Sequence, residues 1–351
     1  MLTDFSLSSE TLYAAAVDLM AAAGYCGEIS LETLAGGGNN RVFRVAASKA
    51  SFLLKAYFQH PDDPRDRLGT EFAFSRFAWD NGVRGLPQPI ACDSQNNLAL
   101  YEFVGGRQLQ PDEVTEAAVE RAIDFYRDLN RCKLLSPARF LPKASEACFS
   151  IREHLQCVER RLERLKTVGG ATECDRSAAD LIRNQLCDVW SRVTELVAGR
   201  SSQLGLTPDA EIPQQDKCLS PSDFGFHNAI SSKEGELKFI DFEYAGWDDP
   251  AKMVCDFFCQ PAVPVSGNYY DKFVEKVVSN LSDSEMHRQR MAILLPVYRV
   301  KWCCIILNDF LPVGNKRRNF ARSADVGESR KVRQLQKAQL VLQDLSQALA
   351  T

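Results

Sequence analysis

The sequence has no strong excess of charge of one sign, and this absence argues against several classes of protein. Its 351 residues carry 42 Lys and Arg against 46 Asp and Glu, a formal net charge of −4. Proteins that bind nucleic acid or an anionic membrane surface usually present an excess of positive charge, so we expect neither partner. Hydrophobic residues make up 45% and charged residues 25% of the chain, which favours a folded globular protein over a disordered one.

Long apolar runs and paired cysteines are also missing. No window approaches the roughly 20 consecutive apolar residues that a membrane-spanning helix needs. The N-terminus has no basic segment in front of an apolar one. The 12 cysteines are scattered without a C-x-x-C pair or a histidine at zinc spacing, so neither a disulfide framework nor a zinc site is predicted. We therefore expect a cytoplasmic protein with reduced cysteines.

The chain divides at the Gly105-Gly106 pair into two regions of different predicted secondary structure. Helical periodicity over residues 8–24 and 67–81 is combined with short alternating stretches that predict antiparallel strands. After the Gly105-Gly106 pair, which resembles a hinge, long helical segments surround one strand-turn-strand unit. The chain is longer than a single hydrophobic core usually accommodates. We therefore predict an α+β protein with a small antiparallel β-rich lobe (residues 1–105) and a larger α-helical lobe (residues 106–351). The helices expected in the second lobe span residues 113–132, 144–166, 175–198, 251–261, 268–281, 283–311 and 328–349.

Three residues, Asp223, Asn228 and Asp241, carry most of the chemical information. The first two are five apart in the segment SDFGFHN, and the third follows the next strand-turn-strand unit in FIDFE. Phosphoryl transfer from ATP needs a carboxylate beside the acceptor hydroxyl and oxygen ligands that hold Mg²⁺ against the phosphates. These three side chains would supply such a set. Each alone could be a turn cap instead, but that alternative does not account for their order.

This pattern resembles the catalytic and metal loops of the aminoglycoside phosphotransferase and choline kinase-like family, a relative of the protein kinases. The segment FIDFEYAGWDDP is similar to the I-D-[FW]-E segment of that family. The resemblance covers roughly residues 30–110 and 215–262, and it implies a two-lobed protein-kinase-like fold. It also implies that Asp223 is the catalytic base, Asn228 a Mg²⁺ ligand and Asp241 the principal Mg²⁺ ligand.

The N-terminal half contains a glycine turn, a strand lysine and a helical glutamate, in the order that a kinase small lobe requires. Lys55 lies in the apolar segment FLLKAYF, where a buried ammonium needs anionic partners such as ATP phosphates and Glu71. Lys55 could instead face solvent, Glu71 could pair with Arg67 on a helix surface, and the glycines could form a simple hairpin turn. The predicted nucleotide-binding residues, which include backbone contacts to adenine before the hinge, are Gly36, Gly37, Gly38, Asn39, Asn40, Lys55, Glu71, Glu102, Phe103 and Val104.

Two positions depart from the pattern of the family. The family usually has a His two positions before the catalytic Asp, where this chain has Pro221, followed by Ser222. The family also commonly has an Asp three residues after an Asp-Pro pair, where this chain has Met253, with Asp256 displaced. One side chain that stabilises the loop in the family is therefore missing, or Asp256 takes its place. We expect His227 to hydrogen-bond to backbone rather than to act as a base.

The helices after the metal loop offer side chains for an acceptor. Acidic residues would suit an amine-bearing acceptor, whereas Lys301 would suit a sugar acid or a phosphorylated sugar; Tyr298 could instead be core. We expect an ATP- and Mg²⁺-dependent phosphotransferase that acts on a hydroxyl of a sugar, aminoglycoside or amino alcohol. A nucleotide-binding pseudokinase scaffold is the alternative, and a protein-directed kinase is disfavoured because no long activation segment is present. The predicted acceptor contacts are Glu243, Trp247, Asp248, Asp249, Tyr298 and Lys301.

Overall fold

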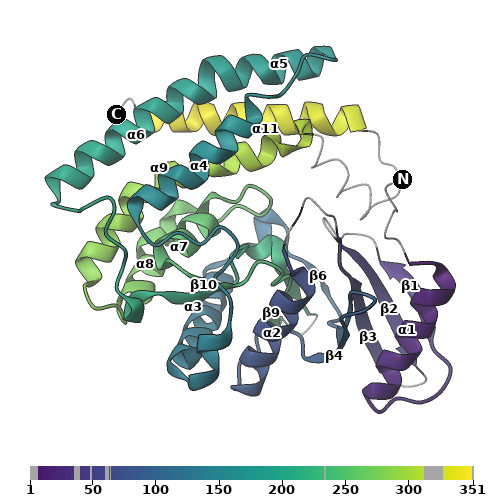
Figure 1. The fold of residues 1–351 in the computed structure, drawn as a ribbon. Helices are drawn as coiled ribbons and strands as arrows, with labels where there is room; N and C mark the ends of the chain where they lie inside the picture. The colour runs from purple at the N-terminus through teal and green to yellow at the C-terminus, as the bar shows by residue number, and fades with distance from the viewer. Residues whose placement is uncertain are drawn as a thin grey trace.

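The N-terminal part of the chain is an antiparallel sheet with a helix against each face (Figure 1). The computed structural model describes residues 7–34, 40–47, 50–59, 63, 65–232, 235–311 and 327–349. The five strands follow the order β1-β2-β3-β5-β4, which confirms the predicted antiparallel sheet. The elements are α1 (Ser9–Ala22), β1 (Ser30–Leu34), β2 (Arg41–Ala47), β3 (Ala50–Ala56), α2 (Arg67–Asp80), β4 (Pro89–Asp93) and β5 (Leu98–Glu102).

The alternation of side chains along β3 and β5 decides where Lys55 points. In their antiparallel register, Lys55 lies opposite Ala99. Leu54 packs in the cluster that contains Met20 of α1, whereas Ala99 packs in the cluster that contains Leu68 of α2. Because successive side chains of a strand point to opposite faces, Lys55 faces α2. It is only 6% exposed, so the alternative of a solvent-facing lysine is wrong.

Helices dominate the rest of the chain, as predicted. The longest that begins and ends within the described residues is α9, which packs against α4, α6, α7, α8 and α11 around the largest apolar cluster. The single helix expected over residues 175–198 is instead two helices joined by a π-helical turn at Ile182–Leu186. The helices are α3 (Glu116–Arg131), α4 (Ile151–Leu165), α5 (Glu173–Leu181), α6 (Cys187–Gln203), α7 (Pro250–Cys259), α8 (Tyr270–Val278), α9 (Ser284–Ile306) and α11 (Gly327–Ala348).

Two small antiparallel sheets position the loops of this helical part. One joins β6 to β8 and β9, and the other pairs β7 with β10, a pairing that the sequence did not predict. Gly106, directly before β6, has a φ of +149°, and a Cβ there would lie 2.2 Å from the carbonyl oxygen of Ser231. Only glycine fits this close approach of two backbones. The strands are β6 (Arg107–Gln108), β7 (Cys218–Ser220), β8 (Ala229–Ser231), β9 (Leu237–Phe239) and β10 (Gly246–Asp248).

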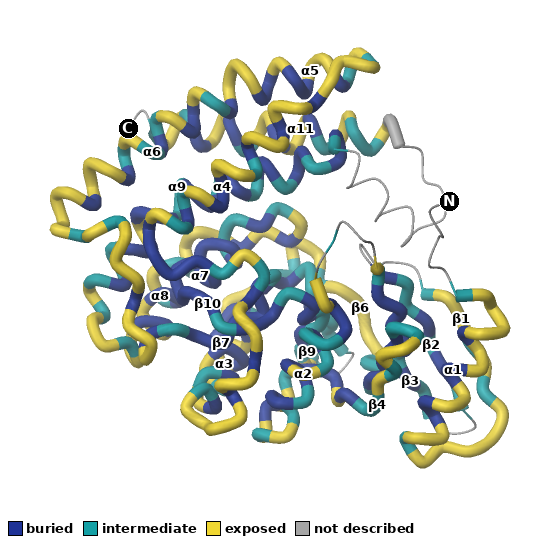
Figure 2. Tube along the Cα trace, viewed as in Figure 1, coloured by how far each residue is buried: buried dark blue, intermediate teal, exposed yellow. Residues whose placement is uncertain are grey.

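The apolar character of α9 exceeds what the sequence led us to expect. The segment Ser284–Phe310 is long and apolar enough, by length and composition alone, to cross a membrane, and it is the one such segment among the described residues. In the fold, 61% of its apolar window is buried by other parts of the protein. Figure 2 shows the same burial along α7, on which eight of the ten residues are buried. Both helices therefore form the core on which the loops rest.

Candidate active site

The loop between β7 and β8 carries Asp223 and Asn228. The chain turns sharply after β7, where the N–H of Asp223 donates to the carbonyl oxygen of Pro221 at 2.9 Å. The loop ends in a 3₁₀ turn, Phe226–Asn228, and Nδ2 of Asn228 donates back to the carbonyl oxygen of Asp223 at 2.9 Å. Asn228 therefore closes the loop. Within the described residues, the Asp223 carboxylate accepts no backbone hydrogen bond, which is unlike a turn cap.

A further hydrogen bond places Asp241 beside this loop. The N–H of Ile240 donates to the carbonyl oxygen of Asn228 at 2.8 Å. Asp241 has a φ of 70°, and Ser222 has a φ of 66°. Non-glycine residues rarely adopt this left-handed region, and residues that do are concentrated at functional sites. Each loop thus contains one residue in this rare conformation, Asp241 in one and Ser222, directly before Asp223, in the other.

Lys55 connects the sheet, α2 and Asp241. Its ammonium donates to Oε2 of Glu71 at 2.7 Å and also to Oδ1 of Asp241. Burial lowers the pKa of Lys55, but the Asp241 and Glu71 carboxylates outweigh it and hold that pKa well above its usual value. Burial raises the pKa of Glu71 to about 7. The alternative of a surface pair between Arg67 and Glu71 is wrong, because both residues are buried and have other partners.

His227 is a neighbour of Asp223 that the sequence analysis placed incorrectly. We predicted a hydrogen bond from His227 to backbone, but its Nε2 lies 3.1 Å from Oδ1 of Asp223. Its Nδ1 is buried and has no partner among the described residues. Burial raises the pKa of Asp223, yet the imidazole of His227 and the amide of Asn228 hold that pKa below its ordinary value. The signal that could have revealed this contact is the spacing of four residues across a tight loop.

Glu243 ties the segment after Asp241 to the N-terminal part. Its Oε1 accepts from Nη1 of Arg67 at 2.7 Å, and its Oε2 accepts from Nδ2 of Asn40 at 2.6 Å. Oδ1 of Asn40 in turn accepts from the N–H of Phe58 at 3.1 Å. Glu243 is 2% exposed, so the predicted contact with an acceptor is corrected to a structural link. The pairing of Arg67 with Glu243 was not predicted from the sequence.

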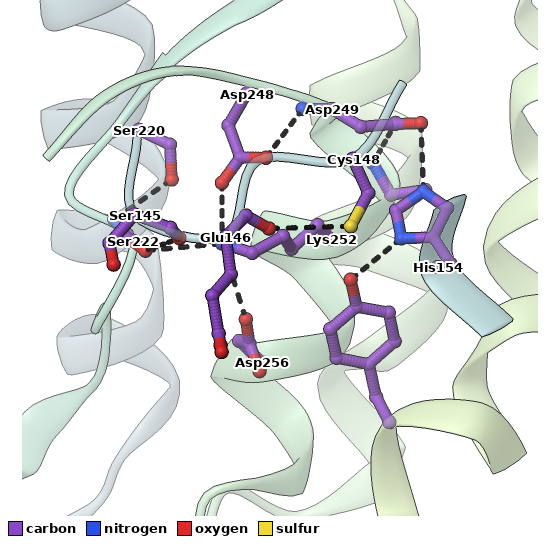
Figure 3. Close-up of polar contacts among 12 residues, drawn as sticks. Ser145, Glu146, Cys148, His154, Ser220, Ser222, Asp248, Asp249, Lys252 and Asp256 are labelled. Carbon is purple, nitrogen blue, oxygen red and sulfur yellow. Dashed lines mark hydrogen bonds and ion pairs between the residues drawn. The ribbon is translucent and has the colours of Figure 1, made fainter. Parts of the chain in front are cut away.

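Three of the other predicted acceptor residues, Asp248, Asp249 and Tyr298, are buried within the protein. Figure 3 shows the polar contacts of Asp248 and Asp249. The carboxylate of Asp249 lies 3.2 Å from Nε2 of His154 and accepts from Nη2 of Arg290 at 2.5 Å. Nδ1 of the same histidine lies 2.7 Å from the hydroxyl of Tyr298. Asp248 is also fully buried. Asp248, Asp249 and Tyr298 cannot touch an acceptor, and we correct their predicted role to support of the loops.

The remaining predicted acceptor residues are Trp247 and Lys301, of which Lys301 is itself only 5% exposed. The indole N–H of Trp247 donates to the carbonyl oxygen of Ala138 at 2.9 Å, and the side chain is half-buried. The ammonium of Lys301 lies 2.8 Å from the carboxylate of Asp256. It also lies close enough to Asp223 to lower the pKa of that residue. Contacts of Trp247 and Lys301 with an acceptor remain predictions.

The segment predicted to contact adenine follows β5. Glu102 is tied into the fold, because its N–H donates to the carbonyl oxygen of Gln88 at 2.8 Å and its carboxylate binds Lys238 at 2.9 Å. Phe103 lies under the guanidinium of Arg44, at 4.9 Å. Phe103 and Val104 make no backbone-to-backbone hydrogen bond with any described residue. Their main-chain groups are therefore available. The predicted phosphate-binding residues Gly36, Gly37, Gly38 and Asn39 lie outside the described residues.

A lysine held by a buried glutamate, next to an Asp-Asn loop and a further Asp, is the arrangement of a phosphotransferase. Residues 30–263 match the phosphotransferase enzyme family, and the chain belongs to that family. It is therefore a small-molecule phosphotransferase, as membership of this family implies. None of the curated proteins that were compared matches the chain.

Solved structures share the fold over nearly the whole chain. A choline/ethanolamine kinase family protein from Mesorhizobium loti is 17% identical, with 96% of this chain and 97% of that chain covered and a TM-score of 0.58. Spectinomycin phosphotransferase in complex with ADP and spectinomycin is 12% identical, with 98% and 99% covered and a TM-score of 0.65. The choline kinase LicA from Streptococcus pneumoniae is 16% identical, with 96% and 100% covered and a TM-score of 0.54. At these identities, the likeness establishes the kinase-like fold alone.

Proposed function

We propose that this enzyme transfers the γ-phosphoryl group of ATP to a hydroxyl group of a small molecule, with Mg²⁺ as cofactor. The observation that carries the proposal is the position of Lys55, whose ammonium contacts both Glu71 of α2 and Asp241 beside the catalytic loop. In kinases, a lysine held by a glutamate positions the phosphates, and a loop Asp orients the acceptor hydroxyl. Residues far apart in the sequence supply both parts here.

The nucleotide would lie where the sheet meets the loops. Lys55 would bind the phosphates, the glycines at residues 36–38 would cover them, and the free main-chain groups of Phe103 and Val104 would meet the adenine edge. Support comes from Asn40, two residues after Gly38 in the sequence, whose side chain donates to Glu243 at 2.6 Å. This hydrogen bond ties Asn40 to the segment that carries Asp241. The two lobes would comprise residues 1–105 and 106–351 and would meet at the Gly105-Gly106 pair.

The donor set of Asn228 and Asp241 fits Mg²⁺. Mg²⁺ prefers oxygen ligands and is usually held by one or two carboxylates together with phosphate oxygens and waters. No group of three or more His, Cys, Asp or Glu suited to a metal occurs among the described residues, so the substrate phosphates would supply the other ligands. Nδ2 of Asn228 is used within the loop, and its Oδ1 would be the ligand atom. When bound, the ion would neutralise charge on the phosphates.

Asp223 would act on the acceptor. The His227 imidazole and Asn228 amide hold its pKa below the ordinary value despite burial, so the carboxylate is ionised at neutral pH. An ionised carboxylate accepts a hydrogen bond from the acceptor hydroxyl, orients it and takes its proton as the phosphoryl group moves. A pseudokinase scaffold has no need of such a group. The presence of Asp223 together with Lys55, Asn228 and Asp241 therefore favours the enzyme over the scaffold.

The acceptor would be a small molecule with a hydroxyl group, such as a sugar, an aminoglycoside or an amino alcohol. Similar structures include kinases named for choline, ethanolamine and spectinomycin, which supports this range. Three of the acidic residues expected to attract an amine are buried in the fold, so they give no preference for a cation. All 12 cysteines are free, which supports a reducing, cytoplasmic location.

A thermal-shift experiment, coupled to a screen for turnover, tests this function. ATP should raise the melting temperature with Mg²⁺ and much less with EDTA, because a ligand that binds the native state stabilises it. Asp241→Asn should remove the Mg²⁺-dependent part of the shift, whereas Asp209→Asn, at an exposed pair with Arg152, should retain it. ATP consumption should then rise with at least one member of a panel of hydroxyl-bearing metabolites. An equal shift in both buffers, or no consumption with any acceptor or water, would contradict the proposal.

A further inference from the structure

Lys252 is a buried lysine that lies beneath the catalytic loop (Figure 3). It belongs to α7 and is 1% exposed. Its ammonium donates to Oδ2 of Asp248 at 2.5 Å and to Oγ of Ser222 at 3.1 Å, and it lies 3.7 Å from Oδ2 of Asp256. Burial lowers the pKa of Lys252, but the Asp248 and Asp256 carboxylates raise it above the usual value. The residue is therefore a fixed cation within the core.

Ser222 is the point at which this cation reaches the loop. It directly precedes Asp223 and has a φ of 66°, a conformation that a non-glycine residue adopts only when its surroundings hold it there. Its N–H donates to Oγ of Ser220 at 3.0 Å, and its hydroxyl donates to the carbonyl oxygen of Ser145 at 3.5 Å. The contact with Lys252 adds a charged donor to these bonds. A charge-assisted hydrogen bond is stronger than a neutral one.

A second path of contacts leads from Lys252 to the other side of Asp223. The carboxylate of Asp256, 3.7 Å from the lysine, accepts from Nε1 of Trp302 at 2.9 Å. The indole ring meets the imidazole of His227 edge to face, with 6.4 Å between the ring centroids. His227 in turn contacts Oδ1 of Asp223. Ser222, which precedes Asp223 in the chain, and His227, which contacts its carboxylate, are thus both linked to α7.

We propose that Lys252 is a positioning residue, which holds Ser222 in its left-handed conformation and so aims the Asp223 carboxylate. The inference rests on the proposed function, because Asp223 must be the residue that orients the acceptor. It also accounts for the departures in the sequence, since Pro221 and Met253 replace the usual His and Asp. The structure places the Lys252 ammonium on the residue between Pro221 and Asp223. The loop is therefore stabilised here by a lysine-to-serine hydrogen bond instead of the usual His and Asp.

The test compares turnover with nucleotide affinity in variants of this contact. Ser222→Ala keeps a Cβ at the same φ and removes only the hydroxyl. The double variant Lys252→Met with Asp248→Asn removes the cation without leaving an unpaired carboxylate at position 248. The matched control is Lys331→Met, which breaks the ion pair of Lys331 with Asp175, 2.7 Å apart, between α11 and α5. Turnover is measured as hydrolysis of Mg²⁺-ATP, with water as the acceptor, well below the melting temperature of each variant.

Ser222→Ala and the double variant should lower kcat by about tenfold to a hundredfold, as expected when a catalytic group is misplaced by a fraction of an ångström or more. The dissociation constant of ADP should stay within about threefold, because Lys55 contacts Glu71 and Asp241 rather than Ser222 or Lys252. Lys331→Met should leave kcat unchanged. If any loss of stability lowered kcat, this variant would lower it too. Unchanged kcat in Ser222→Ala overturns the inference. Asp223→Asn, assayed alongside, separates the two proposals, because full turnover in that variant would overturn the proposed function itself.

Discussion

The guanidinium of Arg67 donates to Oε1 of Glu243 at 2.7 Å, although the two residues are 176 positions apart in the sequence. Both side chains are almost completely buried, at 1% and 0% exposure. Glu243 stands two residues after Asp241, and Arg67 begins α2, the helix that carries Glu71. The pair therefore ties the segment that carries Asp241 to α2, the helix that carries Glu71.

Arg67→Met should destabilise the fold strongly. Removing one partner of a buried ion pair leaves an uncompensated charge, which costs about 3–5 kcal/mol of the free energy of unfolding. Arg65→Met is the matched control, because the side chain of Arg65 is 42% exposed in its ion pair with Asp63. An exposed ion pair contributes about 1 kcal/mol or less to the free energy of unfolding. Urea unfolding of both variants measures the difference. Equal losses would contradict the structural role of Arg67.

Lys55→Met and Glu71→Gln should impair ATP use to different degrees. Loss of the Lys55 ammonium removes the proposed phosphate contact, and deletion of one such group costs roughly a hundredfold in kcat. Glu71→Gln should have a smaller effect, since Asp241 still contacts the lysine. Initial rates of ATP consumption, with the nucleotide dissociation constants, measure both. A wild-type rate in Lys55→Met would exclude the phosphate-binding role, and a larger loss in Glu71→Gln would reverse the assigned order.

Asp249 should contribute to stability in a manner that depends on pH. Burial raises its pKa, but Arg290, His154 and the N–H of Ala251 hold the net value well below the ordinary one. An acid with a depressed pKa stabilises the fold above the pKa of the unfolded chain, about 4, and this contribution disappears as the pH falls through the lower folded value. Asp249→Asn should therefore be less stable at pH 7, with a difference from wild type that narrows below about pH 4.

Urea unfolding between pH 3 and pH 7 measures this narrowing. Asp209→Asn is the control, because the Asp209 side chain is 62% exposed in its pair with Arg152. Its free energy of unfolding should stay within about 0.5 kcal/mol of wild type at each pH. A constant difference between Asp249→Asn and wild type across the range would contradict the depressed pKa.

Much of the fold could be predicted because helices and strands are specified by the periodicity of residues that are close together in the sequence. Most helices begin and end within a few residues of the expected positions; α4 is an exception, because Ser150 caps it later than expected. The strand pair β7 and β10 could not be predicted, since both strands have three residues and β8 and β9 lie between them in the sequence, whereas the equally short β8 and β9 follow each other across one turn. Strands that short have too few alternating positions to show a pattern.

The site was predicted in part for a similar reason. The order of Asp223, Asn228 and Asp241 marks the loop, and the strand alternation turns Lys55 inward. The contacts of His227 with Asp223 and of Arg67 with Glu243 depend on tertiary packing, which leaves no periodic signal in the sequence. Asp248 and Asp249 were misassigned as acceptor contacts because a buried, paired carboxylate cannot be told from an exposed one by sequence position.

The proposed role of Asp223 is tested most directly by one measurement, nucleotide binding and turnover on the same preparation of Asp223→Asn. Asn keeps the shape of the side chain and removes the proton acceptor. The dissociation constant of Mg²⁺-ATP should stay within a few-fold, because Asp223 does not bind the phosphates, while kcat should fall by roughly a hundred- to ten-thousand-fold. Wild-type turnover in a folded Asp223→Asn protein would contradict the assignment of Asp223 as the catalytic base.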